Sequence, residues 1–286
     1  MVIQESKTLT EQGIAGLQGY ANRIRANAVM MTNQNRSGHV GSSLSMADII
    51  AVLFDKILNF DPSDPKMAGR DRFILSKGHA AAGVYAAMAE KGFFPAEWLK
   101  TYYGDAGKLC GHISHHVPGV EFSTGSLGHG LPVALGMALA ARKAKVKFRV
   151  IALLSDGDCN EGSTWEAFML AAQHKVDNLT VIVDYNRVQA LGMSKDVIDL
   201  EPFAEKMELF KWAAKRIDGH DHQQIYDALA NLPLCKGKPS IIIADTVKCK
   251  GIGRLENTVQ SHYRYIPDEE LGDIYKEIGA VAGDWK

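Results

Sequence analysis

The sequence has little cysteine. Its four cysteines, Cys110, Cys159, Cys235 and Cys249, form no CxxC pair. Four widely spaced thiols are too few to hold a chain of 286 residues together by disulfides. We therefore predict reduced cysteines and a cytoplasmic protein.

Long apolar runs and an excess of one charge are also missing. Residues 131–141 form the most apolar long segment, which is too short to span a bilayer, and Met1–Thr10 lacks the apolar core of a secretory signal. The formal net charge of −1 gives no sign of a nucleic acid or membrane partner. No internal repeat is present and no GxGxxG follows an early strand, so a Rossmann-type nucleotide-binding protein is the least favoured class.

The most informative stretch runs from Ile151 to Gly192. The apolar run Phe148–Leu154 stops at an acidic turn and predicts a strand. Ser163 with Glu166 forms a capping-box pattern that predicts the start of a helix. The apolar face of this helix is expected to carry Trp165, Phe168, Met169 and Ala172. The β-branched run Leu179–Val183 predicts a second strand, and a strand, helix and strand of this length indicate a right-handed crossover with paired parallel strands.

Polar side chains follow both of these strands. Asp156 comes just after the first strand, and Asn186 comes 30 residues later, just after the second. Because neighbouring strands lie about 4.8 Å apart, both oxygens are expected to reach one ion. One carboxylate, one amide oxygen and a loop carbonyl suit Mg²⁺ or Ca²⁺ completed by phosphate oxygens, and the next helix N-terminus favours an anion there. We predict a metal-bridged diphosphate, although an isolated Asp-Gly turn more often has no ligand.

The remainder of the chain alternates predicted helices and strands. Thr8 with Glu11 opens a helix that continues to about Thr32, Ser45 with Asp48 opens another, and residues 35–43 between them form a tight loop. Further helices are expected over 80–90, 95–102, 131–141, 202–209, 221–230 and 267–278, and strands over 70–76, 212–217 and 240–244. Residues 104–124 have no periodicity, which is typical of a functional or mobile loop. This order predicts an α/β fold with a doubly wound, mostly parallel sheet flanked by helices, whose ligand crevice lies at the carboxyl ends of the strands.

Several motifs, in this order along the chain, resemble the transketolase family from about Ala21 to Tyr265. They are Ser37-Gly38-His39, Arg70-Asp71-Arg72-Phe73 with Gly78-His79, Gly111-His112, Thr124-Gly125-Ser126-Leu127-Gly128-His129-Gly130, Asp156-Gly157 with Asn186, and His262. The Asp156 to Asn186 stretch resembles the thiamine diphosphate motif, with Ser155 in place of the usual first glycine. His129 stands where many relatives have glutamine, and His262 lacks the usual flanking tryptophan and glycine.

The resemblance implies a thiamine diphosphate-binding fold and assigns roles to individual residues. The implied catalytic residues are His39, His79, His112 and His262. The implied cofactor-binding residues are His79, Gly125, Ser126, Leu127, Gly157, Asp158, Asn186 and His262. The implied Mg²⁺ ligands are Asp156, Asn186 and the carbonyl of Val188. No such support exists for His115, His116, His174, His220 and His222, which are expected to be ordinary surface or core histidines.

The same resemblance implies ketol transfer between sugars. Residues 1–286 correspond to the diphosphate-binding domain, and no candidate for the pyrimidine-binding or C-terminal domains is found. The expectation is the N-terminal subunit of a split transketolase, active with a separate C-terminal subunit in an α2β2 assembly on a sugar phosphate or related sugar. Two alternatives stay open: a subunit of another thiamine diphosphate enzyme, such as a 2-oxo acid dehydrogenase, and a non-catalytic regulatory protein that binds the cofactor.

Overall fold

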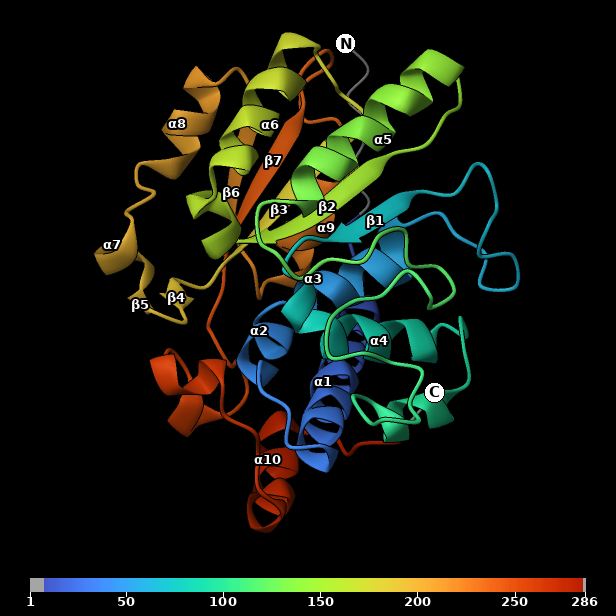
Figure 1. Ribbon diagram of the computed structural model, residues 1–286, viewed down its shortest axis with the longest axis vertical. Coiled ribbons are helices and arrows are strands. Elements are labelled where there is room, and N and C mark those ends of the chain that lie inside the picture. The colour runs from blue at the N-terminus through green and yellow to red at the C-terminus, as the bar shows by residue number, and fades with distance from the viewer. Residues whose placement is uncertain (1–7, 285–286) are drawn as a thin grey trace.

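A parallel five-stranded sheet organises the chain (Figure 1). The computed structural model describes residues 8–284. Most of the N-terminal stretch for which we expect no secretory signal, Met1–Lys7, lies outside the described residues. In spatial order the strands are β1 (Arg72–Leu75), β2 (Val150–Ser155), β3 (Leu179–Tyr185), β7 (Ser240–Asp245) and β6 (Ala213–Asp218). A short antiparallel hairpin, β4 (Val188–Gln189) and β5 (Gly192–Met193), follows β3.

Helices cover both faces of the sheet (Figure 1). One face packs against α5 (Gly130–Ala144), α6 (Gly162–Gln173) and α8 (Phe203–Leu209). The other packs against α1 (Glu11–Gln34), α3 (Ala47–Val52), α4 (Ala81–Glu90) and α9 (His222–Ala230). The remaining α-helices are α2 (Val40–Ser45), α7 (Ser194–Val197) and α10 (Leu271–Ile278). The predicted doubly wound parallel architecture is confirmed.

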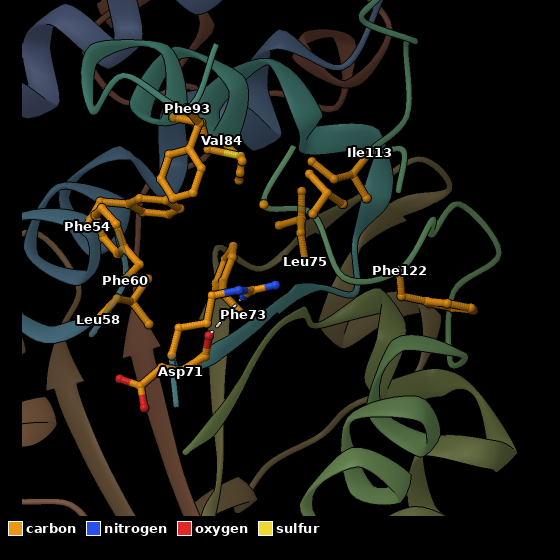
Figure 2. A pocket seen from close by; sticks show the side chains of 14 residues that line it. Phe54, Leu58, Phe60, Asp71, Phe73, Leu75, Val84, Phe93, Ile113 and Phe122 are labelled. Atoms are coloured by element: carbon orange, nitrogen blue, oxygen red, sulfur yellow. Dashed lines mark hydrogen bonds between the residues drawn. The ribbon is translucent and has the colours of Figure 1, made fainter. Parts of the chain in front are cut away.

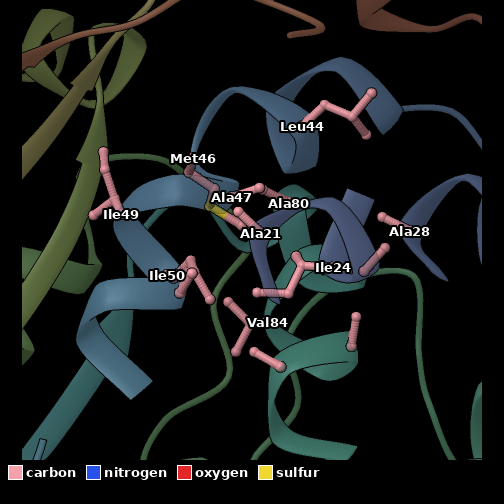
Figure 3. Close-up of a cluster of buried hydrophobic side chains, with 14 of the residues drawn as sticks. Ala21, Ile24, Ala28, Leu44, Met46, Ala47, Ile49, Ile50, Ala80 and Val84 are labelled. Carbon is pink, nitrogen blue, oxygen red and sulfur yellow. The ribbon is translucent and has the colours of Figure 1, made fainter. Parts of the chain in front are cut away.

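Two hydrophobic cores form because successive side chains of a strand point to opposite faces. In β2, Ile151 and Leu153 join the core on the α1, α3 and α4 side, whereas Val150 and Leu154 join the core under α5 and α6. Figure 3 shows part of the first core, and its labelled side chains include Ala21, Ile24, Ile49, Ile50 and Val84. All residues of β2 and β3 are buried, which explains why both read as uninterrupted apolar runs.

The N-terminal helices differ from the prediction in their ends. Thr10, not Thr8, caps α1, because its side-chain oxygen accepts a hydrogen bond from the Gly13 N–H at 3.0 Å. The loop predicted over 35–43 ends early, since α2 begins at Val40. Ser45 ends α2 instead of opening the next helix, and its hydroxyl donates to Asp184 at 2.6 Å. A tertiary partner for a serine is invisible to a local capping pattern.

The start of α6 was predicted wrongly, and so was one residue of its apolar face. Phe168 is buried, and Trp165 and Ala172 pack against the core as predicted, but Met169 does not. The helix begins at Gly162, and Ser163 donates to the carbonyl of Gly128 at 2.7 Å instead of capping the helix. Met169 is 54% exposed, while Thr164, Ala167, Phe168 and Ala171 face the core. Because α6 has apolar residues on several sides, periodicity alone could not identify which side is buried.

The later elements match in type with shifted bounds. The helix predicted over 95–102 is a 3₁₀-helix over Ala96–Thr101, and the closing helix, predicted from Pro267, begins at Leu271. The stretch between Tyr102 and His129 contains no helix or strand, as its lack of periodicity indicated. Within residues 8–284, no helix is both long and apolar enough to cross a membrane.

Candidate functional site

Four strand-end loops converge on one cavity of about 460 Å³, here called the strand-end cavity. The loop after β1 brings His79, the loop after β2 brings Asp156 and Gly157, the segment after β3 brings Asn186, and the segment after β7 brings Lys248. Its other lining residues include His39, Ser42, His112, Gly125, Leu127, Asn160, Val188, Gln189, His262 and Tyr263. The crevice thus lies where a parallel sheet places its ligands.

Asp156 and Asn186 both line this cavity and are 2% and 3% exposed. Strands β2 and β3 pair with Ser155 opposite Asp184, which confirms the predicted pairing. Asp156 accepts from the Gly157 N–H at 3.1 Å and from the Ser194 hydroxyl, and burial raises the pKa of its carboxyl group although Ser194 acts in the opposite sense. The Asn186 amide oxygen accepts from the Val188 N–H at 3.1 Å.

The donor set of the cavity fits a metal ion that shares its ligands with phosphate. Among the described residues, no three His, Cys, Asp or Glu side chains gather closely enough to hold a metal by themselves. Asp156, Asn186 and the Val188 carbonyl are all hard oxygen donors. Mg²⁺ prefers six such oxygens and is usually bound by one or two carboxylates, water and substrate phosphates.

Four histidines from separate segments meet in the same cavity. The ring of His39 lies 5.1 Å from that of His79, 5.9 Å from that of His112 and 5.5 Å from that of His262, between centroids. Burial, with smaller effects of His112 and Lys248, lowers the pKa of His39 to about 4. Burial and Lys248 lower the pKa of His262 to about 3, and the pKa of His79 is also well below its usual value through burial. Near neutral pH each ring therefore offers one donor and one acceptor nitrogen.

Lys248 is a site residue that the sequence reasoning missed. Its side chain is 2% exposed, and its ammonium donates to the Ser42 hydroxyl at 2.7 Å and lies 3.4 Å from His262 Nδ1. Burial and the charge of Lys77 lower the pKa of Lys248 to about 8. No ion pair with a carboxylate is found for it within the described part of the chain. A buried cation of this kind is suited to an anionic ligand, since an unpaired buried charge is costly. Its only sequence signal was its place directly after the last predicted strand.

Beneath the cavity lies a second missed element, the buried ion pair of Lys77 and Asp184, both fully buried. Asp184 also accepts from Ser45, from Thr246 and, at 3.2 Å, from the Asn186 amide. Since these partners come from different segments, Asp184 ties the strand-end loops together.

Two residues predicted to bind the cofactor, Asp158 and Ser126, do not line the strand-end cavity. Asp158 is fully buried, and its oxygens accept from Ser76 at 2.7 Å, from the Gly128 N–H at 3.0 Å and from the Ser155 N–H at 2.9 Å. Its contacts join three loops of the site. Ser126 is exposed and is not one of the lining residues, in contrast to Gly125, Leu127 and Gly157.

Close backbone contact explains one glycine of the site. A Cβ atom on Gly78 would lie 2.3 Å from the Thr124 carbonyl oxygen. The loop that carries His79 can therefore lie against the loop before α5 only with glycine at this position.

The remaining histidines do not line the strand-end cavity. His129 is exposed with its Nδ1 3.0 Å from the Leu127 carbonyl, and His115 contacts Ser123. His220 and His222 approach Asp48 on α3.

A second cavity, on the α4 side of β1, is far smaller at about 30 Å³ (Figure 2). Its lining is mostly apolar and includes Phe54, Phe60, Phe73 and Phe93. A water molecule needs about 10–15 Å³ on this measure, so the space holds one or two waters. The charged lining residues, Arg70 and Asp71, are engaged in ion pairs with Glu121 and Arg149, so we interpret the space as a packing gap.

A family model covers almost the whole chain. Residues 17–282 match the model described as transketolase, thiamine diphosphate binding domain. This match agrees with the resemblance found in the motifs.

Curated relatives of similar length include proteins named as transketolase subunits. The chain is 40% identical to one of these, an apulose-4-phosphate transketolase subunit of Actinobacillus succinogenes, over 92% of this chain and 95% of that protein. It is 37% identical to the 6-deoxy-6-sulfo-D-fructose transketolase subunit SqwG of a Clostridium species, over 91% of this chain and 95% of that one.

Solved structures with the same fold are longer. The transketolase of Campylobacter jejuni superposes with a TM-score of 0.89 at 33% identity, and the match covers 95% of this chain and 44% of that chain. The transketolase of Leishmania mexicana gives a TM-score of 0.89 at 28% identity and is covered to 42%. This chain therefore spans less than half the length of these structures.

Proposed function

The chain belongs to the transketolase family, and on this premise we propose that it is the diphosphate-binding half of a two-chain transketolase. Together with a separate pyrimidine-binding subunit it would transfer a two-carbon ketol unit from a ketose donor to an aldose acceptor. The names of two relatives support the two-chain arrangement, because both are called transketolase subunits and match this chain over 95% of their own length.

The observation that carries the proposal is the composition of the strand-end cavity. Four histidines and the buried ammonium of Lys248 face the same space as Asp156 and Asn186. Cationic and neutral donors thus line the same cavity as hard oxygen ligands. A metal-bridged diphosphate would satisfy both sides.

For the diphosphate, we assign binding to groups on the lysine side. Lys248 would oppose its charge, His79 and His262 would donate hydrogen bonds, and Gly157 would offer its backbone amide. Asp156, Asn186 and the Val188 carbonyl would hold Mg²⁺, with Ca²⁺ as a substitute. The metal charge would offset the phosphate charge that Lys248 leaves unbalanced.

For the sugar, we assign binding to His39 and His112. Each is neutral near pH 7 because burial lowers its pKa, so each can hydrogen-bond a hydroxyl as donor and acceptor. Neutral imidazoles also accept and return protons near the reacting carbon. When bound, thiamine diphosphate would supply the carbanion chemistry that breaks and forms the carbon–carbon bond, while the protein binds, orients and handles protons.

The proposal includes the setting of the enzyme. We expect an α2β2 assembly with the partner subunit, and a cytoplasmic location in keeping with four free thiols. The substrate is expected to be a sugar phosphate or a related sugar. The two similar subunits carry the names of different sugars, a phosphorylated and a sulfonated one, so the ketol donor is the property most open to variation.

The test uses the chain alone and the chain mixed with its partner subunit, both with thiamine diphosphate and Mg²⁺. The isolated chain should bind the cofactor weakly and show no ketol transfer. The equimolar mixture should transfer the ketol unit. Appreciable turnover by the isolated chain would contradict the two-chain proposal, and cofactor binding without turnover in the mixture would favour a regulatory role.

A further inference from the structure

The segment that carries Lys248 is an irregular turn that needs external support. Cys249, the next residue, has φ of +61°, a left-handed conformation that a non-glycine residue adopts only when its surroundings hold it there. The two backbone amides that flank Lys248 are both occupied. The Cys249 N–H donates to the Gly41 carbonyl at 3.1 Å, and the Val247 N–H donates to His220 Nε2 at 2.9 Å. Of these two acceptors, only His220 is a side chain.

The two contacts of His220 define its tautomer. A backbone N–H can only donate, so His220 Nε2 must be the unprotonated, accepting nitrogen. The hydrogen then lies on Nδ1, which is 2.7 Å from Asp48 Oδ2 and donates to it. Asp48 therefore selects the ring form that can hold Val247.

Asp48 is itself held as a carboxylate. It is 2% exposed, and Arg25 of α1 pairs with both of its oxygens. Burial alone would raise its pKa, but Arg25 with His220 and His222 outweighs that effect and keeps the pKa well below its usual range. Arg25 Nε also donates to the Leu44 carbonyl at 3.3 Å, which joins the same group to α2. Helix α2 carries Ser42, whose hydroxyl oxygen accepts a hydrogen bond from the Lys248 ammonium.

We propose that His220 is a positioning residue that sets the place of the Lys248 ammonium by accepting the Val247 N–H, with Asp48 and Arg25 fixing the ring that does so. This inference rests on the proposed role of Lys248 in binding the diphosphate. His220 is not among the residues that line the strand-end cavity, and its two ring nitrogens are taken by Asp48 and Val247. Its effect is transmitted through one hydrogen bond to the residue before Lys248.

Two substitutions separate the two contacts of His220. Glutamine can place an oxygen where Nε2 lies and still accept the Val247 N–H, whereas asparagine reaches only the position of Nδ1 and keeps a donor toward Asp48. His220→Asn should weaken thiamine diphosphate binding by about tenfold, the size expected from one backbone hydrogen bond near a charged ligand. His220→Gln should stay within about threefold of the wild type on the same grounds. Lys248→Met removes the ammonium itself, and its loss of thiamine diphosphate affinity is the reference for both His220 variants.

Binding is measured by titration calorimetry of the full chain with its partner, thiamine diphosphate and Mg²⁺. Hydrogen exchange of the Val247 amide in the ligand-free chain gives an independent measurement. Exchange should accelerate in His220→Asn and stay slow in His220→Gln. Equal affinity and equal Val247 exchange in the two variants would overturn the proposal.

Two further outcomes distinguish a failure of the positioning role from a failure of the proposed function. If Lys248→Met binds the cofactor as well as the wild type does, the proposed role of Lys248 fails, and positioning of the cofactor by His220 fails with it. If His220→Asn does not fold, ¹⁵N spectra of the wild-type imidazole decide the geometry. A protonated Nδ1 and an unprotonated Nε2 support the proposal, and the reverse tautomer overturns it.

Discussion

The ammonium of Lys248 lies 2.7 Å from the hydroxyl oxygen of Ser42, inside the protein and beside a second buried ammonium, that of Lys77. Lys77 pairs with Asp184, whereas Lys248 has a hydroxyl and an imidazole as its partners. Because Lys248 has no carboxylate as a direct partner within the described residues, we expect the site to respond to anions and to pH.

Affinity for thiamine diphosphate should fall as pH rises above about 8. Burial and Lys77 lower the pKa of Lys248 to about 8, so the free side chain loses its proton above that pH. A bound diphosphate would favour the charged form, and binding at pH 8.5 should therefore take up protons. Calorimetry in two buffers of different ionisation enthalpy measures this uptake. In Lys248→Met the uptake should disappear, and an unchanged uptake would contradict the assignment.

Asp156→Ala should abolish the dependence of cofactor binding on Mg²⁺. Asp156 is the one carboxylate among the proposed metal ligands, and its loss should weaken binding at least about tenfold, as losses of metal-site groups do. The fold should persist, because Asp156 lies after β2 and outside both cores. The matched control is Asp105→Ala, which removes an exposed carboxylate. Unchanged Mg²⁺ dependence in Asp156→Ala would count against the metal site.

Breaking the buried ion pair of Lys77 and Asp184 should lower the free energy of unfolding. Asp184→Ala leaves Lys77 as a buried charge without its partner, which typically costs about 3–5 kcal/mol of unfolding free energy. The exposed pair of Asp273 and Lys276 is the control, since Asp273→Ala should change stability by less than about 1 kcal/mol. Urea unfolding of the three proteins makes the comparison. Similar losses in the two variants would show that burial is not the cause.

Gly78→Ala should disturb the site, and Gly16→Ala should stabilise the chain. A Cβ at position 78 would lie 2.3 Å from a backbone oxygen, so the loops that carry His79 and Gly125 must separate. A Cβ on Gly16, inside α1, meets nothing within 4 Å, and alanine there should add about 0.5–1 kcal/mol. Thermal unfolding and cofactor titration are the measurements. A Gly78→Ala variant with normal affinity would contradict the close loop contact.

Acid should destabilise the ligand-free chain through its cavity histidines. The pKa of His39 is about 4 and that of His262 about 3, both lowered first by burial, whereas an unfolded histidine titrates near pH 6.5. Between pH 6.5 and 4 these two histidines are protonated in the unfolded chain and still neutral in the folded chain. The free energy of unfolding therefore falls as pH falls through this range. In His39→Gln, the urea concentration at the midpoint of unfolding should change less steeply with pH than in the wild type. A slope in His39→Gln equal to that of the wild type would contradict this explanation.

Local sequence patterns were sufficient to predict most of the helices and strands. The apolar runs that became β2 and β3 are short, fully buried and followed by turn residues, so their length and their ends were sufficient to identify them. Helix ends were less predictable. Ser45 and Ser163 read as caps, yet both hydroxyls bond to partners far along the chain, Asp184 and Gly128.

The sequence by itself determined that Asp156 and Asn186 follow neighbouring strands, because a parallel crossover of this length leaves little choice of pairing. Its motifs also singled out the four histidines that line one cavity. Only the tertiary structure decided that Lys248, Lys77 and Asp184 belong to the same site. The contacts of Lys77 and Lys248 with Ser42 join residues 35 and 206 positions apart. No local pattern predicts a buried charge, because its energy depends on all the groups packed around it.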